Sequence, residues 1–249
     1  MIIENGKFGS WLWSVILNYQ FPAFSILNSQ FPIKCMIGAS IGRGAMRIIS
    51  SMVRALASAG VSPNVLTAIG VSINIGCGVL FGMGEFFWAG VVLIFANLFD
   101  MLDGNVARLT GNVTKFGGFL DSSLDRLSDM VSFLGIMIFY AGNTPQHSLL
   151  NVGLAGTGLI GSVMVSYTTA KSEASGVKAN VGFLQRPERI VLLIIGALST
   201  WNWNSDFYLF NRMPQVLWVL AIGSIWTLVH RMYFIWGEFR KLEKSTTEQ

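Results

Sequence analysis

The stretch "FDMLDGNVARLTGNVTKFGGFLDSSLDRLSD", residues 99–129, decides the fold class, because it concentrates acidic residues in a chain that is otherwise apolar. The 249 residues are 52% hydrophobic and 12% charged, and their mean hydropathy is +0.55. Soluble domains carry about 25% charged residues. The long apolar runs do not alternate with polar residues as the strands of a membrane barrel would. We therefore predict an all-α, polytopic membrane protein.

Six apolar segments each approach the roughly 20 residues that a membrane-spanning helix needs. They are 64–84, 87–108, 115–141, 149–171, 187–203 and 213–237. The third is unusual, since its first half, "KFGGFLDSSLDRLSD", is rich in carboxylates, yet helical spacing continues through it without a break. The sequence therefore predicts six transmembrane helices.

Basic residues indicate the orientation of these helices. They precede the first span and recur in alternate connections: Arg43, Arg47, Arg54, Lys115, Lys178, Arg186, Arg189, Arg240, Lys241 and Lys244. Because basic loops stay on the cytoplasmic side, both termini and the stretch 99–129 should face the cytoplasm from the cell (inner) membrane. Membrane topology also accounts for the net charge of +4, so we expect no nucleic-acid partner.

The N-terminal part divides in two. Residues 39–60, "ASIGRGAMRIISSMVRALASAG", place arginines at helical spacing opposite an apolar face, which predicts an amphipathic interfacial helix; a solvated basic face is the alternative. Residues 1–38 form an uncertain N-terminal extension, and the nearby Met36 and Met46 leave open whether residues 1–35 belong to the natural protein. The six-helix domain is expected at 61–240, followed by a polar tail at 241–249.

The aspartates of the stretch are regularly spaced. Asp100 and Asp103 are three residues apart, and Asp121, Asp125 and Asp129 are four apart, so each set shares one helix face. A short loop joins the two helices, and the two acidic faces can therefore converge. Intramembrane carboxylates cost roughly 2.5–3.5 kcal/mol each, and a hard divalent cation, Mg²⁺ or Mn²⁺, removes that cost. So many carboxylates indicate two ions, an arrangement typical of phosphoryl chemistry.

Two alternatives compete with this interpretation. The carboxylates could form buried ion pairs with Arg108 and Arg126, or they could line the pathway of an ion or proton transporter. The small residues Gly104, Ala107 and Gly117 favour a transferase, because they let a bulky planar group approach the backbone. Arg108 can bind phosphate oxygens. These residue types suit a nucleotide-bearing substrate.

Residues 100–125 resemble the CDP-alcohol phosphotransferase signature D-x2-D-G-x2-A-R-x8-G-x3-D-x3-D, and they match all eight defined positions. The similarity extends to the six spans, the amphipathic N-terminal helix and "PNVLT" at the start of the first span, and covers roughly residues 40–240. It implies a homodimeric enzyme that transfers a phosphatidyl group from CDP-diacylglycerol to an alcohol and releases CMP.

The resemblance also implies roles for individual residues. Two divalent ions, Mg²⁺ or Mn²⁺, would be held by Asp100, Asp103, Asp121 and Asp125, and Asp125 would also be the general base. The CDP-lipid would contact Pro63, Asn64, Val65, Leu66, Gly104, Ala107, Arg108, Thr114 and Gly117. Asp129 lies outside the signature, and we expect it to be a helix-face carboxylate or to support the metal ligands from behind.

The acceptor alcohol is expected to meet the segment 166–189, "SYTTAKSEASGVKANVGFLQRPER", through Lys171, Arg186 and Arg189. These cations suit an acceptor that carries its own phosphate, although the positive-inside rule alone would also supply them. The segment resembles bacterial phosphatidylinositol-phosphate synthases, in which Lys occupies the position of Thr169, Arg that of Lys171 and Glu that of Gln185. Inositol 1-phosphate is therefore the first choice, and glycerol 3-phosphate the alternative.

Overall fold

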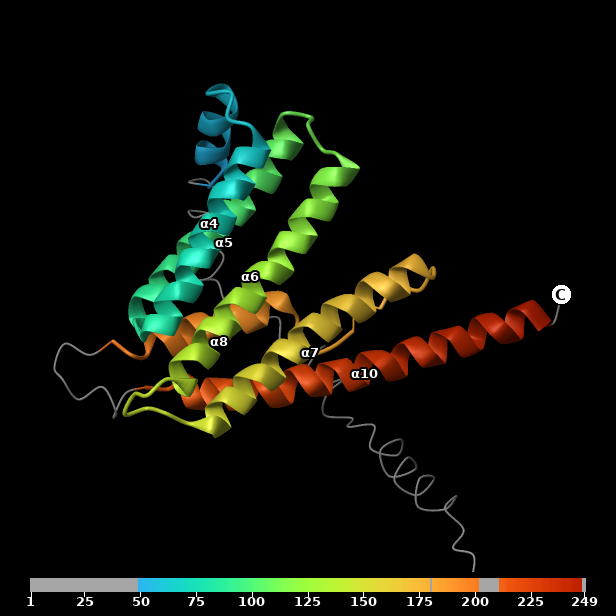
Figure 1. Ribbon diagram of the computed structural model, residues 1–249. Helices are drawn as coiled ribbons and strands as arrows, with labels where there is room; N and C mark the ends of the chain where they lie inside the picture. The colour runs from blue at the N-terminus through green and yellow to red at the C-terminus, as the bar shows by residue number, and fades with distance from the viewer. Residues whose placement is uncertain (1–48, 180, 202–210, 248–249) are drawn as a thin grey trace, which may run out of the picture. The chain divides into compact units, whose positions relative to one another are not determined.

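The computed structural model describes residues 49–179, 181–201 and 211–247 (Figure 1). The chain divides into two units, residues 1–51 and 52–249, and the fold and site below belong to the second. The predicted extension 1–38 and the first part of the predicted amphipathic helix lie outside the described residues. Residues 49–58 are helical, and Arg54 is exposed there.

Everything regular in the described residues is α-helix. The helices that follow residue 60 are α4 (Pro63–Met83), α5 (Phe86–Leu109), α6 (Lys115–Ala141), α7 (Leu149–Ala174), α8 (Arg186–Leu198) and α10 (Met213–Thr247). Gly84 ends α4 in the left-handed conformation, and its N–H bonds back to the carbonyl of Phe81 at 3.1 Å. This cap turns the chain sharply into α5.

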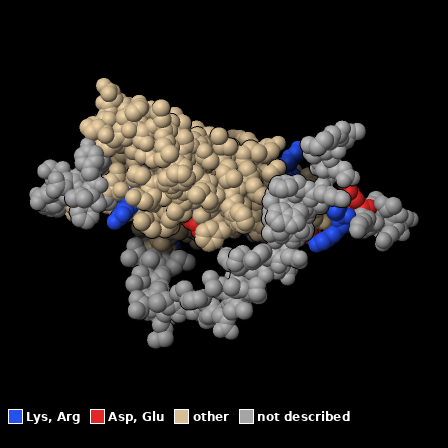
Figure 2. All heavy atoms as spheres, turned by 90° about the horizontal axis from the view of Figure 1, so that it is seen from below, with Lys and Arg blue, Asp and Glu red and all other residues tan. Residues whose placement is uncertain are grey.

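Among the described residues, four helices are long and apolar enough to cross a membrane: Val65–Met83, Phe86–Leu109, Leu149–Ala174 and Met213–Glu243. The protein is therefore a helical membrane protein. Many large apolar side chains on these helices are exposed. The described part of the face in Figure 2 is mostly uncharged, and its charged side chains gather chiefly at one end. Such a surface suits lipid.

Two of the six predicted spans have different ends in the structure. α8 was predicted to reach residue 203 but ends at Leu198 after 13 residues. α10 was predicted to end at 237 but continues to Thr247, over 35 residues. Its last turns carry charged side chains that a helix outside lipid tolerates: Lys241 pairs with Glu238 at 2.6 Å, and the Arg240 guanidinium lies 4.1 Å from the Trp236 ring centroid. The hydropathy pattern marks where the lipid ends, not where the helix ends.

α4 packs along both α5 and α6, and it makes more extensive contacts with each than they make with one another. Glycines allow the close approach. A Cβ at Gly135 of α6 would overlap the carbonyl oxygen of Gly78 on α4, and a Cβ at Gly78 would lie 2.7 Å from the carbonyl oxygen of Val131. A Cβ at Gly70 would meet Phe99 of α5 at 3.6 Å. α4 therefore sets the distance between the two acidic helices.

The remaining helices complete the second unit. α6 packs against α7, α7 against α10, and α8 against both α5 and α10. Phe81, Phe86, Phe133, Phe139 and Tyr140 fill the core where α4, α5 and α6 meet. The rings of Phe86 and Phe139 are edge to face, with centroids 4.8 Å apart. This core lies at the end of the helices away from the aspartates and leaves the acidic end open.

Replacing Gly135 by Ala should loosen the contact between α4 and α6. Overpacking of this kind costs about 1–3 kcal/mol, so the midpoint of thermal unfolding in detergent should fall. The matched control is Gly153→Ala on α7, because a Cβ at Gly153 meets nothing within 4 Å. The free energy of unfolding of that variant should rise by about 0.5–1 kcal/mol, because alanine has a higher helix propensity than glycine. If the thermal unfolding midpoints of both variants rise, the α4–α6 contact is not as close as described.

Candidate metal centre and substrate pocket

Three carboxylates converge at the open end of α5 and α6. Asp100 and Asp103 come from α5 and Asp121 from α6, and one oxygen of each lies within 4.8 Å of the others. Asp103 is buried, Asp100 is partly buried and Asp121 is exposed. Three oxygen donors without a nearby His or Cys suit a hard divalent cation. The chemistry of the donor set therefore fits Mg²⁺ or Mn²⁺.

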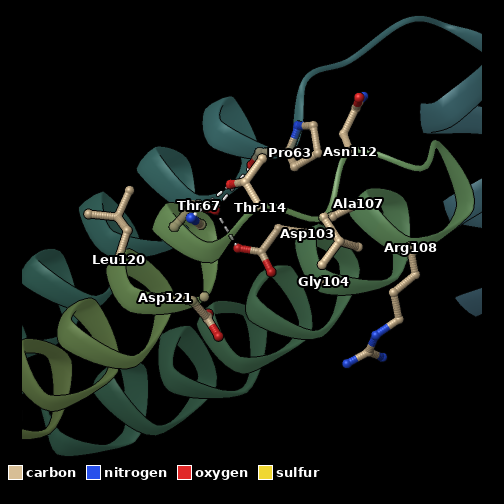
Figure 3. Close-up of a pocket in the computed structure, with 13 residues that line it drawn as sticks. Pro63, Thr67, Asp103, Gly104, Ala107, Arg108, Asn112, Thr114, Leu120 and Asp121 are labelled. Atoms are coloured by element: carbon tan, nitrogen blue, oxygen red, sulfur yellow. Dashed lines mark hydrogen bonds between the residues drawn. The ribbon is translucent and has the colours of Figure 1, made fainter.

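α4 supplies an unforeseen partner to this cluster. The Thr67 hydroxyl, at the end of "PNVLT", donates to Asp103 Oδ2 at 2.6 Å and also lies 3.1 Å from the carbonyl oxygen of Pro63 (Figure 3). The hydrogen bond ties the Asp103 carboxylate to α4. Such support behind a metal ligand commonly orients it.

Asp125 lies one turn after Asp121 and completes the predicted set. A narrow cavity between α4, α5 and α6 is lined by all four signature aspartates together with Thr67, Gly70, Val71, Asn74, Leu124 and Ser128. The spacing argument is thus confirmed in one respect: the two acidic faces meet. Arg126, considered as an ion-pair partner, points elsewhere, because its guanidinium donates to the carbonyl of Ser122 at 2.5 Å.

Arg186, at the start of α8, contacts this cluster. Its guanidinium pairs with Asp125 at 2.7 Å, with Asp100 at 3.5 Å and with Asp129 at 3.7 Å. Arg189 follows one turn later and pairs with Asp129 at 3.6 Å. The "RPER" segment, residues 186–189, therefore faces the aspartates.

A larger cavity of about 170 Å³ opens beside the carboxylates. Its lining includes six of the nine residues predicted to contact the CDP-lipid, namely Pro63, Gly104, Ala107, Arg108, Thr114 and Gly117. It also includes Thr67, Asp103, Asn112, Val113, Gly118, Leu120 and Asp121 (Figure 3). Of the other three, Leu66 is buried and Val65 is exposed, and neither lines the cavity; the Asn64 side chain is outside the described part.

Local structure explains two of the lining residues. Gly104 is on the cavity side of α5, and a Cβ built there meets no atom within 4 Å, so any side chain would occupy the cavity. Thr114 is the N-cap of α6, and its hydroxyl accepts a hydrogen bond from the N–H of Gly117 at 2.9 Å. The positive end of the α6 dipole thus lies at the cavity, where it favours an anionic group.

One predicted acceptor residue, Lys171, lies apart from the aspartates, and a further buried arginine, Arg231, was not identified from the sequence. Lys171 is exposed and forms no ion pair with any carboxylate in the described ranges. Arg231 of α10 is buried, with 4% of its surface exposed; it donates to the carbonyl of Val181 at 2.9 Å and contacts the hydroxyl of Thr169. An arginine within a predicted span is a functional candidate by default, so its position in "TLVHRMYF" was the available signal.

Known proteins are similar to this chain. Residues 60–236 match the family described as CDP-alcohol phosphatidyltransferase. The phosphatidylinositol phosphate synthase of Mycobacterium bovis (strain BCG / Pasteur 1173P2) is 36% identical over 194 residues, which cover 76% of this chain and 86% of that protein. The enzyme of the same name from Streptomyces avermitilis is 32% identical over 211 residues, 82% and 84% of the two chains.

Solved structures agree with the sequence comparison. The crystal structure of Mycobacterium tuberculosis phosphatidylinositol phosphate synthase with CDP-DAG bound matches with a TM-score of 0.68 at 34% identity, over 76% of this chain and 94% of that chain. The same enzyme in complex with manganese and citrate matches with a TM-score of 0.67 at 34% identity, over 76% and 88%.

Mn²⁺ should stabilise the folded protein through the three converging carboxylates. At 100 times its dissociation constant, a ligand that binds only the folded state adds about 2.7 kcal/mol. Asp121→Asn should lose most of this gain, measured as the shift of the thermal unfolding midpoint in detergent. Glu85→Gln is the control, because Glu85 is exposed at the other end of α5. An undiminished shift in Asp121→Asn would place the ion elsewhere.

Proposed function

The chain belongs to the CDP-alcohol phosphatidyltransferase family, and we propose that it transfers a phosphatidyl group from CDP-diacylglycerol to inositol 1-phosphate, releasing CMP. It is a metal-dependent membrane enzyme of phospholipid synthesis. The observation that carries the proposal is the placement of four aspartates between a cavity on one side and two arginines of α8 on the other. Donor and acceptor can therefore approach the carboxylates from different directions. This arrangement and family membership favour transfer over ion or proton transport.

The donor nucleotide is assigned to the larger cavity. Gly104 and Ala107 leave room on the α5 side, and Arg108 with the N-terminus of α6 supplies positive charge for the pyrophosphate. Pro63, Thr114 and Gly117 complete the walls. The relative from Mycobacterium tuberculosis has a solved structure with CDP-DAG bound, which supports this choice of ligand.

Asp100, Asp103, Asp121 and Asp125 would hold two divalent ions, Mg²⁺ or Mn²⁺, which would neutralise pyrophosphate charge and stabilise the leaving CMP. Asp125 is the general base in this proposal: it takes the proton from the acceptor hydroxyl. The hydroxyl oxygen then bonds to the phosphorus that carries the diacylglycerol, and the bond from that phosphorus to the CMP oxygen breaks. Thr67 holds Asp103 in place throughout.

The acceptor's phosphate is assigned to the cationic side. Arg186, Arg189 and Arg231 are the proposed contacts, with Lys171 at the exposed edge. Arg189 and Arg231 are 2% and 4% exposed, and Arg231 contacts only neutral oxygens among the described residues. A buried guanidinium without a carboxylate partner is stabilised by an anionic ligand. This favours a phosphorylated alcohol over serine or free inositol; the named relatives favour inositol 1-phosphate over glycerol 3-phosphate.

We also propose the arrangement in the membrane. α6 and α8 would cross together with the four more apolar helices, since each packs against two of them. The positive-inside rule assigns the aspartates and both termini to the cytoplasmic side of the cell (inner) membrane. The water-soluble acceptor and CMP would then exchange with the cytoplasm. Family resemblance favours a homodimer.

Release of CMP from CDP-diacylglycerol, measured in detergent with Mg²⁺ or Mn²⁺, tests the function. Inositol 1-phosphate should stimulate release most, glycerol 3-phosphate less, and serine, free inositol or no acceptor should leave it near background. The product should be identified as phosphatidylinositol phosphate by mass spectrometry. Stimulation by serine alone would contradict the proposed acceptor class.

Asp125→Asn is the matched catalytic control in the same assay, because it keeps the size of the side chain and removes the base. Its CMP release should fall at least about 100-fold, the lower range of a general base's contribution. Retained thermal stability would show that the loss is chemical. Full activity of the variant would remove Asp125 as the base.

Gly104→Val should fill part of the donor cavity without unfolding the protein. The added side chain has open space in the unliganded cavity, but it should raise the KM for CDP-diacylglycerol by about tenfold or more, since overpacking costs about 1–3 kcal/mol. The KM for the acceptor should change little. Gly76→Val, on α4 and away from the cavity lining, is the control. An unchanged donor KM would show that the nucleotide binds elsewhere.

A further inference from the structure

Asp129 is the one aspartate of the stretch 99–129 that the family signature does not include, and the structure places it at a junction of three helices. It lies one turn after Asp125 on α6, with 14% of its side chain exposed. Its Oδ2 accepts a hydrogen bond from the Ser162 hydroxyl of α7 at 3.1 Å. The same carboxylate meets Arg186 and Arg189 of α8. A residue that served only to make a helix face polar would not need these contacts.

The two oxygens of Asp129 serve different arginines. Oδ1 lies 3.7 Å from Arg186 Nε, and Oδ2 lies 3.6 Å from Arg189 Nη2. The arginines are three residues apart on one helix face and would repel each other without a shared anion. Within residues 49–179, 181–201 and 211–247, Asp129 is the only carboxylate that forms an ion pair with Arg189. Arg189 is otherwise held by the Leu184 carbonyl at 3.3 Å.

Arg186 is divided between two sets of carboxylates. Its closest contact is Asp125 at 2.7 Å, and Asp100 lies at 3.5 Å, so most of its attraction is toward predicted metal ligands. Asp129 draws the Nε side of the guanidinium in the other direction. Without that contact, Arg186 would move fully onto Asp125 and Asp100, where it would compete with a divalent cation for the same oxygens.

We propose that Asp129 is a positioning residue that aims Arg186 and Arg189 at the acceptor's phosphate and keeps Arg186 from settling on the metal ligands. The inference rests on the proposed function, since it takes the α8 arginines as the acceptor site. Asp129 itself touches neither substrate. Asp129 acts on the acceptor through the guanidiniums of Arg186 and Arg189, and the Ser162 hydroxyl holds its carboxylate between them.

Asp129→Asn tests the proposal, because an amide keeps the size and the hydrogen bond from Ser162 but removes the charge. The KM for inositol 1-phosphate should rise by about tenfold. This is the low end of the effect of losing a residue that orients the side chains in direct contact with a ligand. The Mn²⁺ concentration for half-maximal activity should rise in the same variant. The KM for CDP-diacylglycerol should stay within about twofold, because the donor cavity does not include Asp129.

Two further variants separate positioning from stability. Ser162→Ala should raise the acceptor KM in the same direction but less. Ser172→Ala, also buried on α7, should not raise it, because within the described part of the chain the Ser172 hydroxyl bonds only to the carbonyl of Thr169 on its own helix. Glu188→Gln removes an exposed negative charge beside Arg189 and should leave the acceptor KM unchanged. Thermal midpoints recorded for every variant show which ones remain folded.

The outcomes distinguish this inference from the function on which it rests. Wild-type protein that releases no CMP with any phosphorylated alcohol would overturn the proposed function and the inference together. Wild-type activity with an unchanged acceptor KM in Asp129→Asn would overturn the positioning role alone. An equal rise of donor and acceptor KM, or a rise in Glu188→Gln as large as in Asp129→Asn, would likewise reject it. Only an acceptor-selective change in Asp129→Asn and Ser162→Ala supports it.

Discussion

The close contact between α4 and α6 is the constraint on which the site depends. Gly78 and Gly135 bring the two backbones together, and Gly70 lies where α4 is in ordinary contact with Phe99 of α5. Because α4 packs along both acidic helices, it determines the space between them. A looser α4 would let the faces separate, and direct packing of α5 on α6 would fill the space that a ligand needs. The site formed by the signature residues 100–125 therefore depends on α4, a helix that lies wholly outside the signature.

Charge is distributed across this space in an ordered way. Asp100, Asp103 and Asp121 converge on one side, and the arginines of α8 face them from the other. Asp125 belongs to both groups, since it lines the acidic cavity and pairs with Arg186 at 2.7 Å. Intramembrane carboxylates each cost roughly 2.5–3.5 kcal/mol, so the cluster opposes folding unless cations compensate it. Arg186 supplies part of that compensation within the chain, and a divalent ion is suited to supply the rest.

Periodicity in the sequence predicted the parts of this arrangement that one helix determines. Asp121, Asp125 and Asp129 fall on one face of α6, and the predicted span 115–141 coincides with that helix. Contacts between helices were not predictable in the same way. Thr67 donates a hydrogen bond to Asp103, 36 residues later in the sequence, and Arg231 donates one to the carbonyl of Val165, 66 residues earlier. No local sequence pattern predicts either contact. The end of α10 was missed because hydropathy reports the boundary of the lipid, whereas the helix continues beyond it through charged residues, of which Lys241 pairs with Glu238.

Thr169 links the cationic side to the choice of acceptor. Its hydroxyl donates to the carbonyl of Val165 at 2.9 Å and contacts Arg231, which also donates to that carbonyl. A lysine here, as in the phosphatidylinositol-phosphate synthases that this segment resembles, would add a second buried cation beside Arg231. The neutral hydroxyl instead holds Arg231 without sharing or cancelling its charge. Under the proposed function, the acceptor's phosphate therefore meets one cation fewer than it would with a lysine at position 169, and Arg186, Arg189 and Arg231 supply the positive charge.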